Sequence, residues 1–308
     1  MRTVSAIKNI NSTLIVYGFN MVLQFIIRFV LLYYLSIEYL GLNGLFDNIL
    51  TVLSLTELGI GPAIIFSLYA PLANHDLETA KSIMRIFKKA YIYIGTLILF
   101  LGLCISPFVQ HLIKVPPNIA YLNIFFLLFV VDTGISYFYS YKKCLLIADQ
   151  KQYIANYYRG ITQLIGSLFQ IALVILTHSF WVYIILRICM TFSENFLIAR
   201  KADHLYSFLN EKNIQPLNKD IYQSIIRNIK ALILHKIGGV TVFGTSNIIL
   251  SKFVGLSAVA LYTNYYLIIN GIDKLSDQVF NALKASVGNL NESHDDAHKL
   301  VIFKRLEF

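Results

Sequence analysis

Charged residues are scarce in this chain: Asp, Glu, Lys and Arg make up 14% of its 308 residues. A soluble domain of this size carries about 25% charged residues. Apolar residues reach 56% here, more than a soluble fold could hide from water. The scarcity of charge therefore excludes an ordinary soluble domain and predicts an all-α integral membrane protein.

Cysteine is also rare. Cys104, Cys144 and Cys189 lie in or at the ends of apolar blocks and lack the spacing of metal ligands, which argues against a disulfide framework or a zinc site. No Ser-His-Asp set, phosphate loop or paired-carboxylate motif lies in a polar segment. We therefore expect no catalytic residue, no metal and no cofactor, in a protein that is not an enzyme.

Apolar blocks long enough to cross about 30 Å of hydrocarbon recur along the chain. The predicted helices cover residues 12–36, 43–70, 88–113, 119–145, 154–177, 179–200, 229–252 and 258–283. The first block resembles a signal peptide but has no small-residue cleavage site, so we expect it to remain. The sequence thus predicts about eight transmembrane helices.

The Lys and Arg residues lie mainly in every second gap between these blocks. Those gaps hold 19 basic residues, whereas the alternate gaps hold only Lys114 and Lys252. The positive-inside rule then predicts that both termini are cytoplasmic. This distribution also accounts for the formal charge of +9 without nucleic acid as a partner.

Two cytoplasmic segments are distinctive. Residues 201–228 are polar and contain Pro216, so we expect them to join two bundles. Residues 76–91 place Leu77, Ala80, Met84 and Phe87 opposite a basic face, as in an interfacial helix on anionic membrane lipids.

The polar connection divides the chain into a six-helix N-terminal lobe at 1–200, the connecting segment at 201–228, and residues 229–308. A short echo of residues 38–42 at 257–261 fits a parallel repeat, in which the seventh helix begins a second lobe. The last part would then be the first two helices and cytoplasmic tail of an incomplete C-terminal lobe. On this interpretation the chain is a fragment or a truncated gene product.

Polar residues recur within the apolar blocks at the three- and four-residue spacing of one helix face. The stripes are Asn20, Gln24 and Arg28; Asn43, Asp47, Thr51, Ser54, Glu57 and Gly61; Asp132, Ser136, Ser140 and Lys143; Asn156, Arg159, Gln163, Ser167 and Gln170; Arg187, Thr191 and Glu194; and Asn270, Lys274, Asp277 and Asn281. Ionisable groups at bilayer depth are costly and normally face a bundle interior. Six such stripes predict a shared hydrated cavity.

Five cations at membrane depth suit an anionic ligand, especially a diphosphate. The candidate substrate-binding residues are Arg28, Arg159, Arg187, Lys236, Lys274 and Gln24, and the candidates for ion coupling or gating are Glu57, Asp132, Glu194 and Asp277. The alternative is that Arg28 or Arg159 pairs with a carboxylate and merely holds helices together. The possible partners are Glu57, Asp132 and Glu194.

The second predicted helix contains Gly59, Gly61 and Pro62. Proline removes a backbone donor and clashes with the carbonyl four residues earlier, so we expect a kink here. The kink is a candidate hinge, although ordinary packing of a membrane helix is an equal alternative.

Two stretches resemble the polysaccharide-transporter branch of the multidrug, oligosaccharidyl-lipid and polysaccharide exporter superfamily, as found in the oligosaccharide flippases of Gram-positive bacteria. The first is Glu38-Tyr-Leu-Gly-Leu-Asn-Gly-Leu-Phe46 with Leu55-Thr-Glu-Leu-Gly-Ile-Gly61 and Ser67-Leu-Tyr-Ala-Pro-Leu-Ala73. The second is Leu234-His-Lys-Ile-Gly238, Thr245-Ser-Asn-Ile-Ile-Leu-Ser251, Phe253-Val-Gly-Leu256, Leu261-Tyr-Thr-Asn-Tyr265 and Ala285-Ser-Val-Gly-Asn-Leu290. Ser246 departs from the Asp usual in that family.

The resemblance implies a flippase in the bacterial cell membrane that moves undecaprenyl-diphosphate-linked oligosaccharide outward by alternating access, with a cationic cavity between two lobes. Its implied partners are the lipid-linked oligosaccharide, membrane lipids and other polysaccharide assembly proteins, and H+ or Na+ is its implied coupling ion. One alternative is an ion-coupled exporter of organic cations, which would favour an acidic cavity. Another is a membrane polysaccharide polymerase or glycosyltransferase, which would need larger outside loops than residues 37–42, 114–118 and 178 provide.

Overall fold

The computed structural model describes residues 2–57, 59–115, 119–211, 215–239 and 245–293, and they contain helices but no strand. The α-helices are α1 (Arg2–Tyr34), α2 (Ile37–Leu53), α3 (Ile60–Ala73), α4 (Leu77–Ile105), α5 (Leu122–Ala148), α6 (Gln152–Thr177), α7 (Phe180–Leu205), α8 (Lys219–Gly239), α9 (Ser246–Phe253) and α10 (Leu256–Ser293). The 3-10 helices are η1 (Ser54–Glu57), η2 (Ser106–Leu112) and η3 (Ser207–Asn210).

Five of these helices are long and apolar enough to cross a membrane: α1, α4 with η2, α5, α6 and α7. A sixth span results if α2 with η1 and α3 count as one bent span. The prediction of an all-α membrane protein is therefore confirmed, whereas the count of eight remains a prediction. Predicted helix 229–252 corresponds to parts of α8 and α9, and residues 240–244 between them lie outside the described part of the chain.

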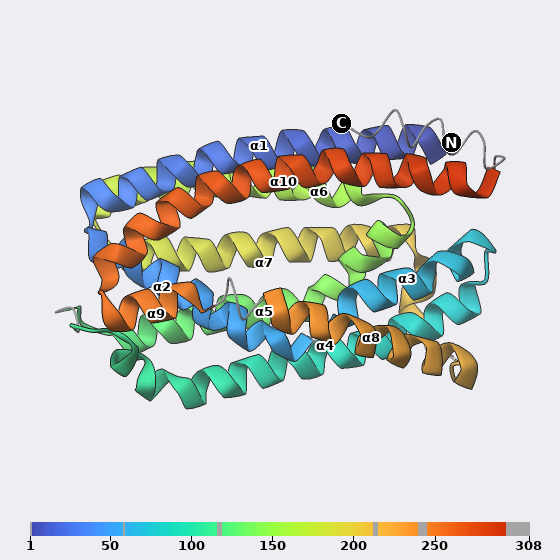
Figure 1. The fold of residues 1–308 in the computed structure, drawn as a ribbon, viewed down its shortest axis with the longest axis horizontal. Helices are drawn as coiled ribbons and strands as arrows, with labels where there is room; N and C mark the ends of the chain where they lie inside the picture. Colours follow the sequence, from blue (N-terminus) through green and yellow to red (C-terminus); the bar gives the residue numbers. More distant parts are fainter. Residues whose placement is uncertain (1, 58, 116–118, 212–214, 240–244, 294–308) are drawn as a thin grey trace.

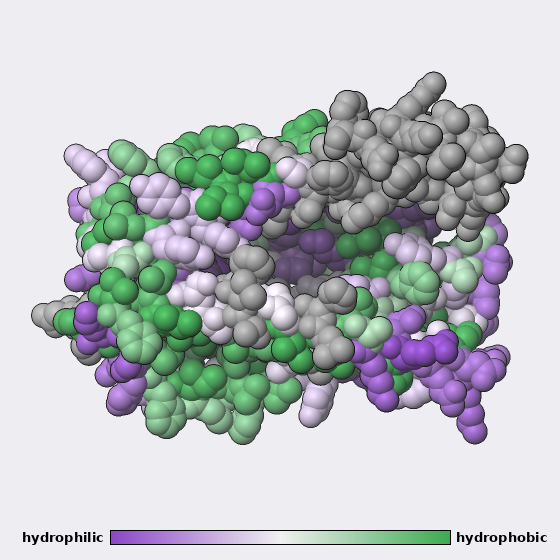
Figure 2. Space-filling view, viewed as in Figure 1, coloured by the Kyte–Doolittle hydropathy of each residue, from purple (hydrophilic) through white to green (hydrophobic). Residues whose placement is uncertain are grey.

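The outer flank of the bundle is apolar. Ile15, Phe66 and Leu176 are 70%, 66% and 77% exposed. Figure 2 shows apolar side chains over much of one flank and hydrophilic side chains gathered at the right-hand end. Exposed apolar area is unfavourable in water but not in hydrocarbon, so this surface fits a lipid environment.

Five helices form a ring: α1 packs on α6, α6 on α7, α7 on α5, α5 on α2, and α2 on α1. Figure 1 shows α1, α6 and α10 along one edge of the bundle, α7 across its middle and α4 along the opposite edge. One apolar core, which includes Phe46, Phe126 and Phe129, fills one part of the bundle. A second core includes Ile83, Phe87 and Leu145.

The helices after the polar connection pack on those before it. α10 lies along α2 and α1, and α8 contacts α3. A Cβ at Gly41 would overlap the Leu256 carbonyl, and one at Gly44 would lie 2.7 Å from Cγ2 of Thr263. These two glycines of the first recognisable stretch therefore permit close packing of α2 on α10. The lobe division at 201–228 remains a prediction.

The second predicted helix bends at Gly59, within the stretch where the kink is expected. The helical path of α2 and η1 runs to Glu57 and resumes at Ile60 in α3, bent by 46°, and Gly59 just before α3 has a φ of 75°. Pro62 lies in the first turn of α3, where a missing N–H costs no helical hydrogen bond. The bend therefore coincides with the left-handed glycine and not with the proline; a hinge motion there remains a hypothesis.

The segment at 76–91 is not a separate interfacial helix, as the sequence suggested, but the beginning of α4. Asp76 caps this helix by accepting a 3.0 Å hydrogen bond from the N–H of Thr79, and the hydrogen bonds from Thr79 lower the pKa of Asp76. Ala80, Met84 and Phe87 are buried in the bundle. The apolar face thus packs on protein instead of lipid.

Candidate functional site

A polar pocket of about 270 Å³ lies inside the five-helix ring. Its lining residues are Gln24, Arg28, Asn43, Asp47, Asp132, Gln163, Gln170, Tyr183, Arg187, Met190 and Thr191. Figure 2 shows a recess with hydrophilic side chains near the middle of the face in view. Polar stripes from α1, α2, α5, α6 and α7 therefore meet at one pocket, as their spacing predicts.

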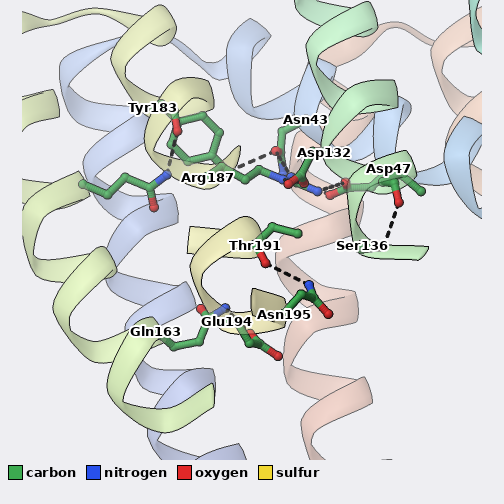
Figure 3. A network of polar contacts seen from close by, with 12 residues as sticks. Asn43, Asp47, Asp132, Ser136, Gln163, Tyr183, Arg187, Thr191, Glu194 and Asn195 are labelled. Atoms are coloured by element: carbon green, nitrogen blue, oxygen red, sulfur yellow. Dashed lines mark hydrogen bonds and ion pairs between the residues drawn. The ribbon is translucent and has the colours of Figure 1, made fainter. Parts of the chain in front are cut away.

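Arg187 is the most heavily bonded side chain of the pocket (Figure 3). Its Nε donates to Oδ2 of Asp132 at 2.9 Å and its Nη2 to Oδ1 of Asp47 at 2.8 Å. Its Nη1 donates to Oδ1 of Asn43 at 3.1 Å, and the guanidinium lies 4.3 Å from the ring centre of Phe129. Arg187 thus joins α7 to α5 and α2 by charge-assisted bonds.

Further hydrogen bonds fix the partners of this arginine. The Tyr183 hydroxyl donates to Oδ1 of Asn43 at 3.1 Å, and Nε2 of Gln170 donates to the carbonyl of Tyr183 at 2.8 Å. The Asp132 side chain is 7% exposed, and its Oδ1 has no hydrogen-bond partner among the described residues. Asp47 is more open, at 43% exposure, and both carboxylates line the pocket.

Arg28 lies in the same pocket with different partners. Its Nη1 donates to the carbonyl of Thr263 at 2.5 Å and to Oδ1 of Asn264 at 3.1 Å, both on α10. Within the described residues it forms no ion pair, so the expected alternative pairing with Glu57 or Asp132 does not occur there. Arg28 is therefore a partly buried cation held by neutral acceptors.

Arg159 lies in a neighbouring polar cluster around Glu194. The Glu194 carboxylate accepts from Nε2 of Gln163 at 3.4 Å and lies 3.8 Å from Nζ of Lys143 and 4.0 Å from Nε of Arg159. The Arg159 side chain is 48% exposed and does not line the pocket. The expectation that three arginines face one cavity is thus met by Arg28 and Arg187, while Arg159 pairs with a carboxylate.

Glu57 lies away from the pocket. Its carboxylate accepts hydrogen bonds from the hydroxyls of Tyr91 at 3.1 Å and Tyr137 at 3.4 Å, beside the bend. A Cβ at Gly61 would lie 2.7 Å from the Tyr91 oxygen and 2.9 Å from Oε1 of Glu57. The change from α-helix to the 3-10 helix η1 lies between Asp47 and Glu57, and the stripe that starts at Asn43 continues only along an unbroken α-helix.

The resemblance implied a cationic cavity. The pocket is not predominantly basic, because its lining contains two arginines and two aspartates. Sequence reasoning assigned Asn43, Asp47 and Gln170 to stripes without naming them as ligands. Tyr183 precedes Arg187 by one helical turn, a spacing that could have identified it. Thr263 and Asn264 belong to the second recognisable stretch, but no polar stripe in the sequence pointed to them as partners of Arg28.

The side chains of Lys236, Lys274 and Asp277 lie outside the described part of the structure, so their predicted roles remain predictions. Within the described residues, no group of three His, Cys, Asp or Glu side chains could hold a metal ion. Comparisons with models of known families, with characterised proteins and with solved structures gave no match.

Proposed function

We propose that this protein is a flippase that moves undecaprenyl-diphosphate-linked oligosaccharide repeat units across the bacterial cytoplasmic membrane for surface polysaccharide export. Both termini would face the cytoplasm, as the basic residues predict. The polar pocket within an apolar bundle supports transport, because charged groups inside a membrane bundle are costly and by default mark a path for a substrate or ion. The choice of cargo rests on the sequence resemblance and on Arg28.

The observation that carries the proposal is the bonding of Arg28. A guanidinium has five N–H donors, and Nη1 of Arg28 makes the hydrogen bonds to Thr263 and Asn264. No carboxylate lies within ion-pair distance of Arg28 among the described residues, although Asp47 attracts it from farther away, so a ligand can still neutralise its charge. A diphosphate oxygen pair fits the planar fork of such a group.

Arg187 would act differently in the same cycle. Two carboxylates already neutralise it, so it would fix α7 against α5 and α2 while Arg28 receives the cargo. Because Arg28 is bonded to α10, displacement of its neutral acceptors by a diphosphate would loosen α10. Cargo binding would thereby favour a second arrangement of α10 against the ring, as alternating access requires.

The test is export measured beside membrane abundance in cells that depend on this protein. Arg28→Ala should abolish surface polysaccharide and leave lipid-linked oligosaccharide on the inner leaflet, while abundance stays near normal. Arg28→Lys keeps the charge without the fork and should retain part of the export. Normal export by Arg28→Ala at normal abundance would exclude a required role for Arg28.

An ion-coupled exporter of organic cations is the second candidate, and the open carboxylate of Asp47 favours it. In that case Asp47→Asn should abolish export of a cationic dye from inside-out vesicles, and Arg28→Ala should leave it intact. If the unmodified protein did not transport the dye, this candidate function would be excluded.

A further inference from the structure

We propose that a basic pocket at the start of α4 binds the phosphate headgroup of an anionic membrane phospholipid. This pocket of about 360 Å³ is lined by Lys81, Met84, Arg85, Lys88, Lys89, Ile92, Tyr141, Phe208, Leu209 and Glu211. It is separate from the polar pocket of the ring, with which it shares no lining residue. The proposal is independent of the transported cargo.

The wall of this basic pocket is built by fixed contacts between η3 and α4. Nζ of Lys81, which is 4% exposed, donates to Oε2 of Glu211 at 2.6 Å and to Oε1 of Glu78 at 2.7 Å. The hydroxyl of Ser82 donates to the carbonyl of Gln215 at 2.7 Å. Lys81 is thus a positioning residue that holds the segment after α7 over α4, and its charge is neutralised within the protein.

The other cations of the pocket are left for a ligand. Arg85, Lys88 and Lys89 have the three- and four-residue spacing of one helix face and form no ion pair within the described residues. Like charges at this spacing repel one another, so a bound anion would relieve the repulsion. Tyr141, which is 7% exposed, also lines this pocket, so its hydroxyl can donate to the same anion.

The position of the pocket identifies a lipid as the ligand. The continuous span of α4 with η2 is 36 residues long, whereas about 20 residues cross the hydrocarbon. The first turns of α4 therefore reach the headgroup region, at the end where Figure 2 shows hydrophilic side chains. One helical turn deeper, Ile92 is 42% exposed and continues the lining toward the acyl-chain region. The basic side chains would contact the phosphate of an anionic phospholipid, and the apolar side chains would contact its acyl chains.

The test uses the purified full chain in neutral detergent, titrated with dioctanoyl phosphatidylglycerol or dioctanoyl phosphatidylcholine and observed by native mass spectrometry. We expect one preferred site for phosphatidylglycerol. The variant Arg85→Gln/Lys88→Gln/Lys89→Gln should weaken its affinity at least about tenfold, since each basic residue near the membrane surface contributes roughly fivefold. Wild-type affinity in this variant would overturn the proposal.

The matched control is Arg200→Gln/Lys219→Gln/Arg227→Gln, which removes three exposed charges that do not line this pocket. It should retain the affinity, and an equal loss would mean nonspecific attraction. Glycerol 3-phosphate should compete poorly with the lipid. If it bound as tightly as the lipid, the ligand of this pocket would be a soluble phosphate and the lipid proposal would be wrong. If the triple variant is not monodisperse, Arg85→Gln/Lys89→Gln should still lose affinity.

Discussion

Arg28 and Arg187 line one pocket, yet their surroundings differ. Arg187 contacts two carboxylates, an amide oxygen and an aromatic face, whereas Arg28 contacts a carbonyl and an amide on a single neighbouring helix. A cation neutralised within the bundle stabilises helix packing, but a cation with neutral partners can still bind an anion. The comparison therefore distinguishes a charge that protein carboxylates neutralise from one that has neutral partners in the same pocket.

The largest effect should come from Arg187→Ala. This change leaves Asp132 buried beside Asp47 without a counterion, and breaking a buried pair in this way costs about 3–5 kcal/mol. Membrane abundance and the melting temperature in detergent should both fall strongly. When added to Arg187→Ala, Asp47→Asn/Asp132→Asn should restore much of the abundance, because no uncompensated charge remains. If abundance did not recover, unpaired carboxylates would not be the cause of the loss.

The next effect tests the link between Arg28 and α10. Gly44→Val inserts side-chain atoms where Thr263 now packs, and overpacking of this kind costs about 1–3 kcal/mol. Cross-linking between engineered cysteines on α1 and α10 should weaken, while the Arg187 contacts persist. Gly18→Val is the control, because a Cβ at Gly18 meets nothing within 4 Å; equal destabilisation by both variants would refute close packing as the cause.

Arg28→Ala should affect stability less than Arg187→Ala does. It removes two hydrogen bonds to neutral acceptors and strands no charge, so we expect a loss of about 1–2 kcal/mol. The measurement is thermal unfolding of both variants in one detergent. If Arg28→Ala proved as destabilising as Arg187→Ala, the two arginines would share a structural role, and the comparison would fail.

The smallest effect should follow Glu194→Gln. Its contacts with Lys143 and Arg159 are long, at 3.8 and 4.0 Å, and solvent screens the attraction to Arg159, which is 48% exposed, although Glu194 itself is 12% exposed. We expect less than about 1 kcal/mol in thermal unfolding. Asp132→Asn in the same assay should cost more, and the reverse order would show that the Glu194 cluster is the stronger anchor.

The stretches that resemble a transporter family have a clear packing role in this structure. Gly41 and Gly44 of the first stretch meet Leu256 and Thr263 of the second, and Nδ2 of Asn247 donates to the carbonyl of Gly44 at 3.1 Å. Glycine is needed there because backbones approach closely. These motif residues are therefore informative about helix assembly, and Asn43, Thr263 and Asn264 of the same stretches also contact the arginines of the pocket.

The sequence by itself determined the helical membrane class, most helix positions and the polar faces of α1, α2, α5, α6 and α7, because hydrophobic length and helical periodicity are local properties. It placed the kink of the second helix correctly near Gly59 but attributed it to Pro62, which lies in the first turn of α3. Only the tertiary structure decided that Arg187 contacts Asp47 and Asp132 while Arg28 contacts α10. Such pairing depends on the relative depth and rotation of several helices, which no stripe in a single helix specifies.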